Sequence, residues 1–289
     1  ENLSRLYGEN LPKNSNKEKH CGNGTFTCVI VRDENPLYKP RQTSKGIRIV
    51  NINLFDAKKL YRSWTGGGHK IHATDNIQET KDNLKTLGLY DKYYKQKTFE
   101  TMQDVFRELN KHPKLEWVVM RNFEDMPDNI TIDEHLDVDL LVSDYYLVKT
   151  ILDGTSATAC NANKNNRYED GKNRILNYVI IKNKKVLFDF RSVGDNYYDT
   201  KLQQDMLNTR IMHPNGFYIP NKEMHLYSLI YHAIIHKQNI SSTYLKVFKQ
   251  YGLKDSEINK KHLKKKLDAW LQQKGYSYCK PEPSVGYFL

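Results

Sequence analysis

The first third of the chain combines short β-branched stretches with helical patterns. Residues 24–31 (GTFTCVIV) and 46–54 (GIRIVNINL) are rich in Val, Ile and Thr, which predicts two strands. Apolar spacing then predicts helices over residues 56–64, 77–87 and 101–110. Asp75 or Asn76 can cap the second of these helices. The elements predict a small α+β module over residues 20–113, preceded by a polar, flexible arm over residues 1–19.

The pattern changes after residue 113. Strands are predicted over residues 115–120 (LEWVVM), 137–143 (DVDLLVS), 175–182 and 185–190, with a helix over 144–152. From residue 221 onwards apolar residues recur at helical spacing, first over residues 223–237 and then in two lysine-rich helices. The fold class is therefore α+β, with a core over residues 114–222 and a basic helical region over residues 223–289.

Composition limits the class of protein. A chain of 289 residues fits about two domains, and 38% hydrophobic residues exclude wholesale disorder. No apolar run approaches the roughly 18 residues of a membrane-spanning helix, and the polar N-terminal residues do not predict a secretory signal. The four cysteines, Cys21, Cys28, Cys160 and Cys279, form no CxxC pair and no zinc spacing. We therefore expect free thiols and a cytoplasmic location.

Positive charge is concentrated near the C-terminal end. The chain has 45 basic and 34 acidic residues, a net charge of +11, and residues 246–280 hold ten lysines against three acids, a net of +7. Such a patch favours anionic partners: nucleotides, phosphorylated glycans, nucleic acid or an acidic membrane surface. A solvated helix face is the alternative interpretation.

Two closely spaced acids are the main candidate for chemistry. Residues two apart on a strand share a face, so Asp137 and Asp139 are expected side by side. Two such carboxylates repel each other unless a cation lies between them, and oxygen ligands of this kind suit Mg²⁺ or Mn²⁺. Asp189 adds a third carboxylate on a later apolar strand (VLFDF). Alternatively, Asp137 begins an ordinary strand and Asp139 pairs with a lysine. On the metal hypothesis, Asp139→Ala is expected to abolish turnover without lowering the melting temperature, because it relieves carboxylate repulsion.

The region from Trp117 to Asp144, with WVVMRNFEDMP and then HLDVDLLVSD, resembles the nucleotidyltransferase superfamily that includes DNA polymerase beta and the aminoglycoside nucleotidyltransferases. That resemblance, which covers roughly residues 115–191, implies a mixed-sheet core and identifies Asp137, Asp139 and Asp189 as catalytic metal ligands. It implies magnesium-dependent transfer of a nucleotidyl or phosphoryl group from a phosphorylated donor. Arg121 and Asn122 stand where the family has a Gly-Ser turn, and Arg121 can hold a phosphate itself.

Other functions stay open. Similar patterns occur in phosphocholine and ribitol-phosphate transferases, and we expect a sugar, polyol or glycan acceptor because no nucleic-acid module is evident. The Asp-Val-Asp motif could instead belong to a nucleotide-sugar glycosyltransferase, although there the apolar strand usually precedes the acids. A nucleic-acid-binding protein on an inert nucleotidyltransferase core is the non-enzymatic alternative.

A glycine-rich segment is the second candidate site. Gly66, Gly67 and Gly68 allow close approach of backbone N–H groups to a phosphate, and His69, Lys70 and His72 add positive charge. We therefore predict that these six residues contribute to binding a phosphorylated ligand. A structural turn is the alternative interpretation.

Further cations and histidines complete the candidates. The long connection over residues 153–173 and the residue after it include Arg167 and Arg174, which could close over a triphosphate. Arg191 lies two residues past Asp189 and is expected on the same face, where it can neutralise the site or a phosphate. His225, His232 and His236 share one helix face among isoleucines, which predicts core histidines with local hydrogen bonds rather than a zinc site.

Overall fold

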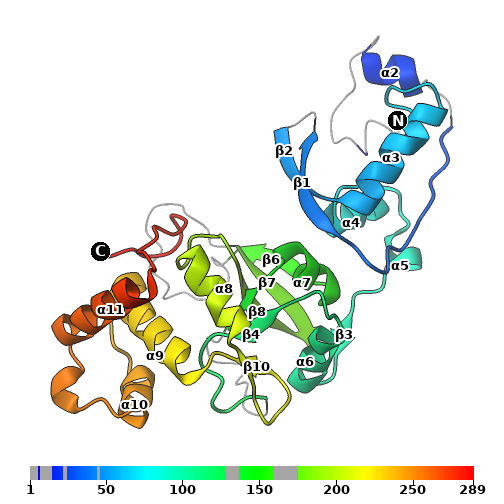
Figure 1. Cartoon of the computed structure of the whole chain (residues 1–289). Helices are drawn as coiled ribbons and strands as arrows, with labels where there is room; N and C mark the ends of the chain where they lie inside the picture. Colours follow the sequence, from blue (N-terminus) through cyan, green and yellow to red (C-terminus); the bar gives the residue numbers. More distant parts are fainter. Residues whose placement is uncertain (1–5, 7–14, 22–24, 44–45, 128–136, 159–174) are drawn as a thin grey trace. The chain divides into compact units, whose positions relative to one another are not determined.

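The computed structural model describes residues 6, 15–21, 25–43, 46–127, 137–158 and 175–289. The chain divides into two compact units, Glu1–Gln96 and Lys97–Leu289 (Figure 1). The division falls before the predicted boundary at residue 113, because the helix over Met102–Asn110 packs into the core of the second unit. None of the described helices has the length and apolar character needed to span a membrane.

The first unit contains a two-stranded antiparallel ribbon and several helices. Strands β1 (Tyr38–Thr43) and β2 (Gly46–Asn51) pair in full register. The helices are α2 (Asn16–Cys21), α3 (Ile52–Trp64), α4 (Ile77–Thr86) and α5 (Tyr90–Tyr93). Among its described residues only two hydrophobic side chains, Val50 and Leu84, are buried.

Three sequence predictions for this unit need correction. Residues 25–31 form no strand and are mostly exposed, since the strand that pairs with β2 lies later, at β1. The second predicted strand ends at Asn51, whose side chain accepts a hydrogen bond from the Asn53 N–H and so begins α3. Residues 16–19 of the predicted arm lie in α2.

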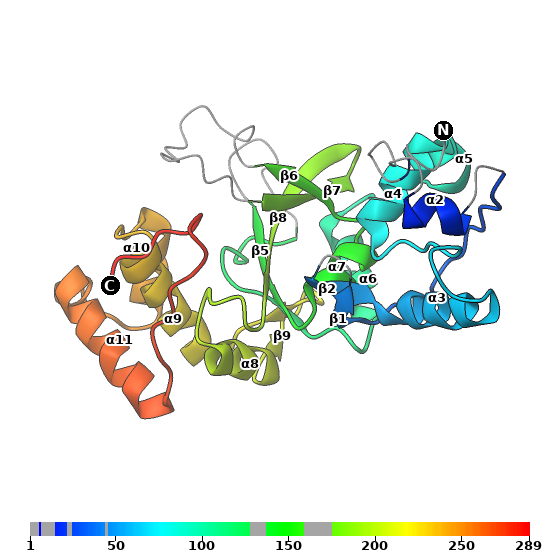
Figure 2. The ribbon, with the colours of Figure 1, turned by 90° about the horizontal axis from the view of Figure 1, so that it is seen from above.

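In the described part of the second unit, six strands form one mixed sheet. The strands are β3 (Thr98–Phe99), β4 (Trp117–Val119), β5 (Val138–Val142), β6 (Thr155–Thr158), β7 (Ile175–Ile181) and β8 (Lys184–Ser192). Their order is β3-β7-β8-β5-β4, and β6 pairs with the first part of β7. Strands β5 and β8 are parallel neighbours at its centre, which Figure 2 shows side by side. The fold class is α+β, as the sequence predicts.

The two faces of this sheet pack against different helices. Alternate residues point to opposite faces of a strand. Val138, Leu140 and Val142 of β5 therefore join one hydrophobic cluster with α6 (Met102–Asn110) and α7 (Tyr145–Ile151). Leu141 joins a second cluster with the helices of the C-terminal part. Every β5 residue is buried, so a charged side chain on this strand needs a partner.

The C-terminal helices belong to the same packed unit as the sheet. They are α8 (Thr200–Asn208), α9 (Lys222–Tyr231), α10 (Ser242–Gln250) and α11 (Lys260–Lys274), and the last three lie together in Figures 1 and 2. Their buried residues share a cluster with Val118, Met120 and Leu141 of the sheet. The predicted boundary at residue 222 therefore lies inside a compact unit, because one hydrophobic cluster contains residues from both sides of it.

The predicted helix over residues 223–237 changes its winding. Helix α9 ends at Tyr231, and His232–His236 form one turn of π-helix. Short elements complete the unit: the ribbon of β9 (Ile211–Met212) and β10 (Tyr218–Ile219), and a 3-10 turn at Asp255–Glu257.

Candidate metal centre

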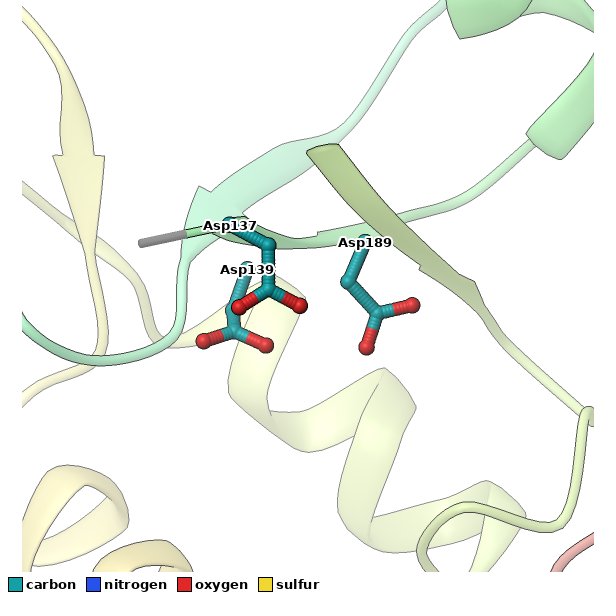
Figure 3. A group of neighbouring side chains, drawn as sticks. All are labelled: Asp137, Asp139 and Asp189. Atoms are coloured by element: carbon teal, nitrogen blue, oxygen red, sulfur yellow. The ribbon is translucent and has the colours of Figure 1, made fainter. Parts of the chain in front are cut away.

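Three carboxylates converge on one side of the central strands. Asp139 of β5 and Asp189 of β8 are direct partners in the parallel register, and Asp137 lies immediately before β5. One carboxylate oxygen from each of the three residues lies within 4.8 Å of the others. Figure 3 shows the three side chains pointing the same way, towards the C-terminal helices. The strand-face prediction for these acids is confirmed in its geometry.

The acids lie on the face of the sheet that packs against the C-terminal helices. Asp139 shares a face with Leu141, which packs in the cluster of α8 to α11. Asp139 and Asp189 are 4% and 3% exposed, and Asp137 is half-buried. Buried carboxylates are costly unless they are paired or bind a cation, so their partners decide what this centre can do.

Arg121 is the partner of Asp139. It follows β4, which is antiparallel to β5, and its Nη2 donates to Asp139 Oδ1. Burial opposes the charged guanidinium, but Asp139 raises the pKa of Arg121 well above its ordinary value. The next residue, Asn122, has φ +57°, the left-handed conformation that glycine favours and asparagine tolerates. The described ion-pair partner of Asp139 is therefore a buried arginine.

Arg191 is the partner of Asp189. Its Nε donates to Asp189 Oδ2 at 3.0 Å, on the same strand face. Its Nη1 donates to Glu282 Oε1 at 3.0 Å, and Asp195 Oδ2 is 3.9 Å away. Each of the two buried acids thus contacts a buried arginine.

One tyrosine contacts both arginines. The Tyr197 ring centroid lies 4.4 Å from Cζ of Arg191 and 5.8 Å from Cζ of Arg121, a cation–π arrangement. Its hydroxyl forms a 2.8 Å hydrogen bond with Nδ1 of His232. Burial raises the pKa of Tyr197, so the hydroxyl keeps its proton at neutral pH. Tyr197 therefore links the centre to the π-helical turn.

The three histidines are buried, as predicted, but the predicted local hydrogen bonds hold only for His225 and His232, because among the described residues neither ring nitrogen of His236 has a partner. His225 hydrogen-bonds through Nδ1 to the Tyr251 hydroxyl at 2.6 Å, and His236 packs against Tyr197. Burial, with Arg121 next in importance, lowers the pKa of His225 to about 4 and that of His236 to about 3. Both are therefore neutral at neutral pH, and in the described chain neither joins a group of potential metal ligands.

On this geometry we expect Asp139→Ala to lower stability, in place of the unchanged stability expected from the sequence. Asp139 does not simply repel another acid, because it is the ion-pair partner of Arg121. Removing it leaves a buried guanidinium without its partner, which costs about 3–5 kcal/mol. A loss of stability in this variant therefore does not exclude a metal-binding role for Asp139.

The glycine-rich segment lies in the first unit, whereas the acids lie in the second. Gly66, Gly67 and Gly68 all have positive φ and follow the end of α3, and Gly67 N–H donates to Arg62 O at 2.6 Å. The next helix, α4, begins only at Ile77, and its cap Asn76 accepts a hydrogen bond from the Glu79 N–H.

Local groups engage the charged side chains of the same segment. Lys70 Nζ donates to Thr65 O at 2.7 Å, His69 O accepts from Cys21 Sγ, and His72 Nε2 lies 3.8 Å from Glu79 Oε1. Only the Lys70 contact belongs to the turn that ends α3, and the predicted ligand role stays a prediction.

Three residues named in the sequence analysis, Arg167, Arg174 and Cys160, lie outside the described residues.

The lysine-rich segment over residues 246–280 is described in full. Of its ten lysines, three form ion pairs with described residues: Lys249 with Asp255, Lys264 with Asp268 and Lys274 with Glu223. Sequence reasoning missed Glu282 and Tyr197. Glu282 contacts Arg191 from a distant part of the chain, and Tyr197, whose ring packs on Arg191, lies outside any helix or strand, so no periodic pattern marks it.

Comparison with known proteins gives no assignment for this chain. No protein family model, curated protein or solved structure matches it. The function must therefore be argued from the centre itself.

Proposed function

We propose that this protein is a metal-dependent transferase that moves a nucleotidyl or related phosphoryl group. The observation that supports the proposal best is the registered pair Asp139 and Asp189 on parallel strands, with Asp137 beside them. Carboxylates from neighbouring strands are the usual ligands of metal ions in phosphoryl transfer. We further propose that the sheet of the second unit is a nucleotidyltransferase-like core, on the basis of the sequence resemblance and this arrangement of acids.

The three acids fit a hard divalent cation such as Mg²⁺ or Mn²⁺. Oxygens on opposite sides of Mg²⁺ lie about 4 Å apart and neighbouring oxygens about 3 Å apart, so three oxygens within 4.8 Å of one another would move closer by side-chain rotation to share one ion. Three carboxylates and two arginines leave one net negative charge among these five groups. A divalent cation offsets that charge. When bound, it would neutralise phosphate charge and align the reacting groups.

Arg121 and Arg191 add positive charge beside the three acids. Arg121 and Arg191 each lie one hydrogen bond from a proposed ligand, so either guanidinium can contact a phosphate held at the same centre. Asp189 is our candidate for accepting the proton of the acceptor hydroxyl. We propose a sugar, polyol or glycan acceptor, since the sequence contains no evident nucleic-acid module.

Detection of transfer tests this function. Each nucleoside triphosphate and nucleotide sugar is incubated with Mn²⁺ and a panel of sugar, polyol and glycan acceptors, and the products are resolved by mass spectrometry. Pyrophosphate together with a nucleotidyl adduct supports the proposal, whereas a transferred sugar with release of the nucleotide favours the glycosyltransferase alternative. Asp137→Asn, which leaves both arginine pairs intact, must abolish the product.

A second candidate function is polyanion binding through α10 and α11. Seven lysines there and nearby are exposed and form no ion pair in the part of the chain that the structure describes: Lys246, Lys254, Lys260, Lys261, Lys265, Lys266 and Lys280. No large hydrophobic side chain is exposed over residues 242–274. Base stacking on aromatic rings is therefore not favoured, and contacts to phosphates are. This surface fits a nucleic-acid-binding role, or the binding of a phosphorylated acceptor.

A further inference from the structure

Arg191 carries an anion contact that the metal centre does not use. Its Nε contacts Asp189, and the Tyr197 ring lies 4.4 Å from Cζ, so two sides of the guanidinium are held by buried groups. The Nη1 group instead contacts Glu282, at 3.0 Å. Asp195, at 3.9 Å, accepts hydrogen bonds from Tyr197 N–H and from Gln203. The Glu282 carboxylate therefore forms no described hydrogen bond other than the one with Arg191.

The two members of this pair differ in exposure. The Arg191 side chain is 6% exposed, whereas that of Glu282 is 53% exposed. An ion pair that involves a half-exposed carboxylate stabilises a protein weakly, by about 1 kcal/mol or less. A buried arginine, in contrast, needs an anion beside it. The Arg191 guanidinium is therefore fixed by buried contacts, whereas the Glu282 carboxylate is bound weakly.

The C-terminal segment presents Glu282 to this position. Pro281 and Pro283 flank it and restrict the backbone, and Glu282 O accepts from Val285 N–H in a turn. Farther along, Phe288 N–H donates to Ile235 O in the π-helical turn at 2.8 Å. Residues 281–288 thus lie against the helical region while one carboxylate reaches the centre.

We propose that Arg191 is a phosphate-binding site beside the metal centre, and that Glu282 occupies it until a polyphosphate donor displaces the carboxylate. A phosphate group offers more charge and more acceptor oxygens than a carboxylate, and it matches the planar guanidinium donors. Asp189 fixes Arg191 next to the metal ligands, so the bound group lies at the reacting position. The inference rests on the proposed function for the identity of the donor, but the anion site itself depends only on Arg191 and Glu282.

Removal of one negative charge tests the displacement. Isothermal titration of the full chain with sodium tripolyphosphate, at a fixed Mg²⁺ concentration, compares the wild type with Glu282→Gln. We expect the variant to bind tighter by about fivefold, the factor that corresponds to a half-exposed ion pair. Glu116→Gln is the matched control, since Glu116 also forms a partly exposed pair with an arginine, Arg210. Its affinity is expected to equal that of the wild type.

A second variant links the effect to Arg191. Lysine keeps the charge but not the fork of donors, so in an Arg191→Lys background Glu282→Gln should change affinity by less than about twofold. Unchanged affinity in Glu282→Gln alone overturns the inference, as does equal tightening in Glu116→Gln.

Mn²⁺ binding, measured separately by electron paramagnetic resonance, distinguishes this result from failure of the proposed function. If Mn²⁺ does not bind but Glu282→Gln still tightens tripolyphosphate, the anion site stands and the transferase proposal falls. If Mn²⁺ binds and Glu282→Gln leaves the affinity for tripolyphosphate unchanged, the anion site is overturned and the transferase proposal stands.

Discussion

Asp139 and Asp189 are direct partners across two parallel strands, yet each carboxylate contacts a different buried arginine. One arginine precedes its acid in the sequence and the other follows it: Arg121 comes after β4 and before Asp139, and Arg191 lies on β8 two residues after Asp189. The two arginines offset most of the charge of the three neighbouring acids, two of which are buried. It also places two cations beside the three acids, where the proposed function needs contacts to phosphate.

Stability measurements separate the roles of the acids. Asp139→Ala should lower the free energy of unfolding by about 3–5 kcal/mol, because Arg121 loses its buried partner. Asp137→Asn should change it by less than about 1 kcal/mol, since Asp137 is half-buried. Urea denaturation of both variants checks this difference. The double variant Arg121→Met with Asp139→Leu should recover most of the loss. An Asp139→Ala protein as stable as the wild type would contradict the buried ion pair.

The buried histidines predict a loss of stability in mild acid. The pKa of His225 is lowered to about 4 and that of His236 to about 3, against 6.5 for a free histidine. Below pH 6.5 the unfolded chain binds protons that the folded chain does not, so stability is complete above this value and falls as the pH falls. From about pH 7 to about pH 5, each histidine should remove on the order of 2 kcal/mol.

Substitution of one histidine tests this pH dependence. His236→Phe keeps a ring among the tyrosines and should remove about half of the effect in urea titrations at both pH values. The exposed His262 serves as the control, and His262→Phe should leave the full slope. An unchanged slope in His236→Phe would mean that the pKa of this histidine is the same in the folded and unfolded protein, which would contradict the lowered value.

The origin of these predictions shows where sequence reasoning succeeds. The cap Asn76 and the acid pair Asp137 and Asp139 follow from residues close in the chain, so they are readable from the sequence. Helix α8 was missed although Asp199 caps it and Leu202 and Met206 recur at helical spacing. This signal was present in the sequence.

Other features depend on tertiary structure and leave no such signal. The strand prediction over residues 24–31 failed because β-branched composition does not supply a partner strand. The contact of Arg121 with Asp139 joins residues 18 apart, and that of Arg191 with Glu282 joins residues 91 apart. Both depend on sheet register and helix packing, which no local pattern encodes.

The glycine-rich segment needs a gentler test than substitution of a glycine. Gly67 has φ +81°, so Gly67→Val strains the backbone by about 1–2 kcal/mol whether or not a ligand binds. Lys70→Met removes only an exposed side-chain contact to Thr65 O. If the segment binds a phosphorylated ligand, this variant should weaken binding severalfold at an unchanged melting temperature. Equal affinity would leave the segment as the turn that ends α3.

The lysine surface predicts salt-dependent binding if it contacts a phosphate polymer. Neutralising Lys260, Lys261 and Lys265 together by substitution with glutamine should reduce the log-salt slope of binding to duplex RNA by about one unit for each lysine in contact. Mobility shift across a salt series measures this slope. Glutamine at Lys182, Lys184 and Lys185, three exposed lysines where β7 turns into β8, should leave it unchanged. Absence of any shift at low salt would remove the nucleic-acid alternative.

Metal binding at the three acids is the central claim, and a crystal soaked with Mn²⁺ and a nucleotide tests it most directly. Anomalous scattering from manganese should appear between the carboxylates of Asp137, Asp139 and Asp189, with a phosphate beside Arg191. The same soak of Asp137→Asn, which retains both arginine pairs, should show weaker density or none. Manganese bound elsewhere while Arg121 and Arg191 keep their contacts to Asp139 and Asp189 would contradict the account and make the acids a structural ion-pair cluster.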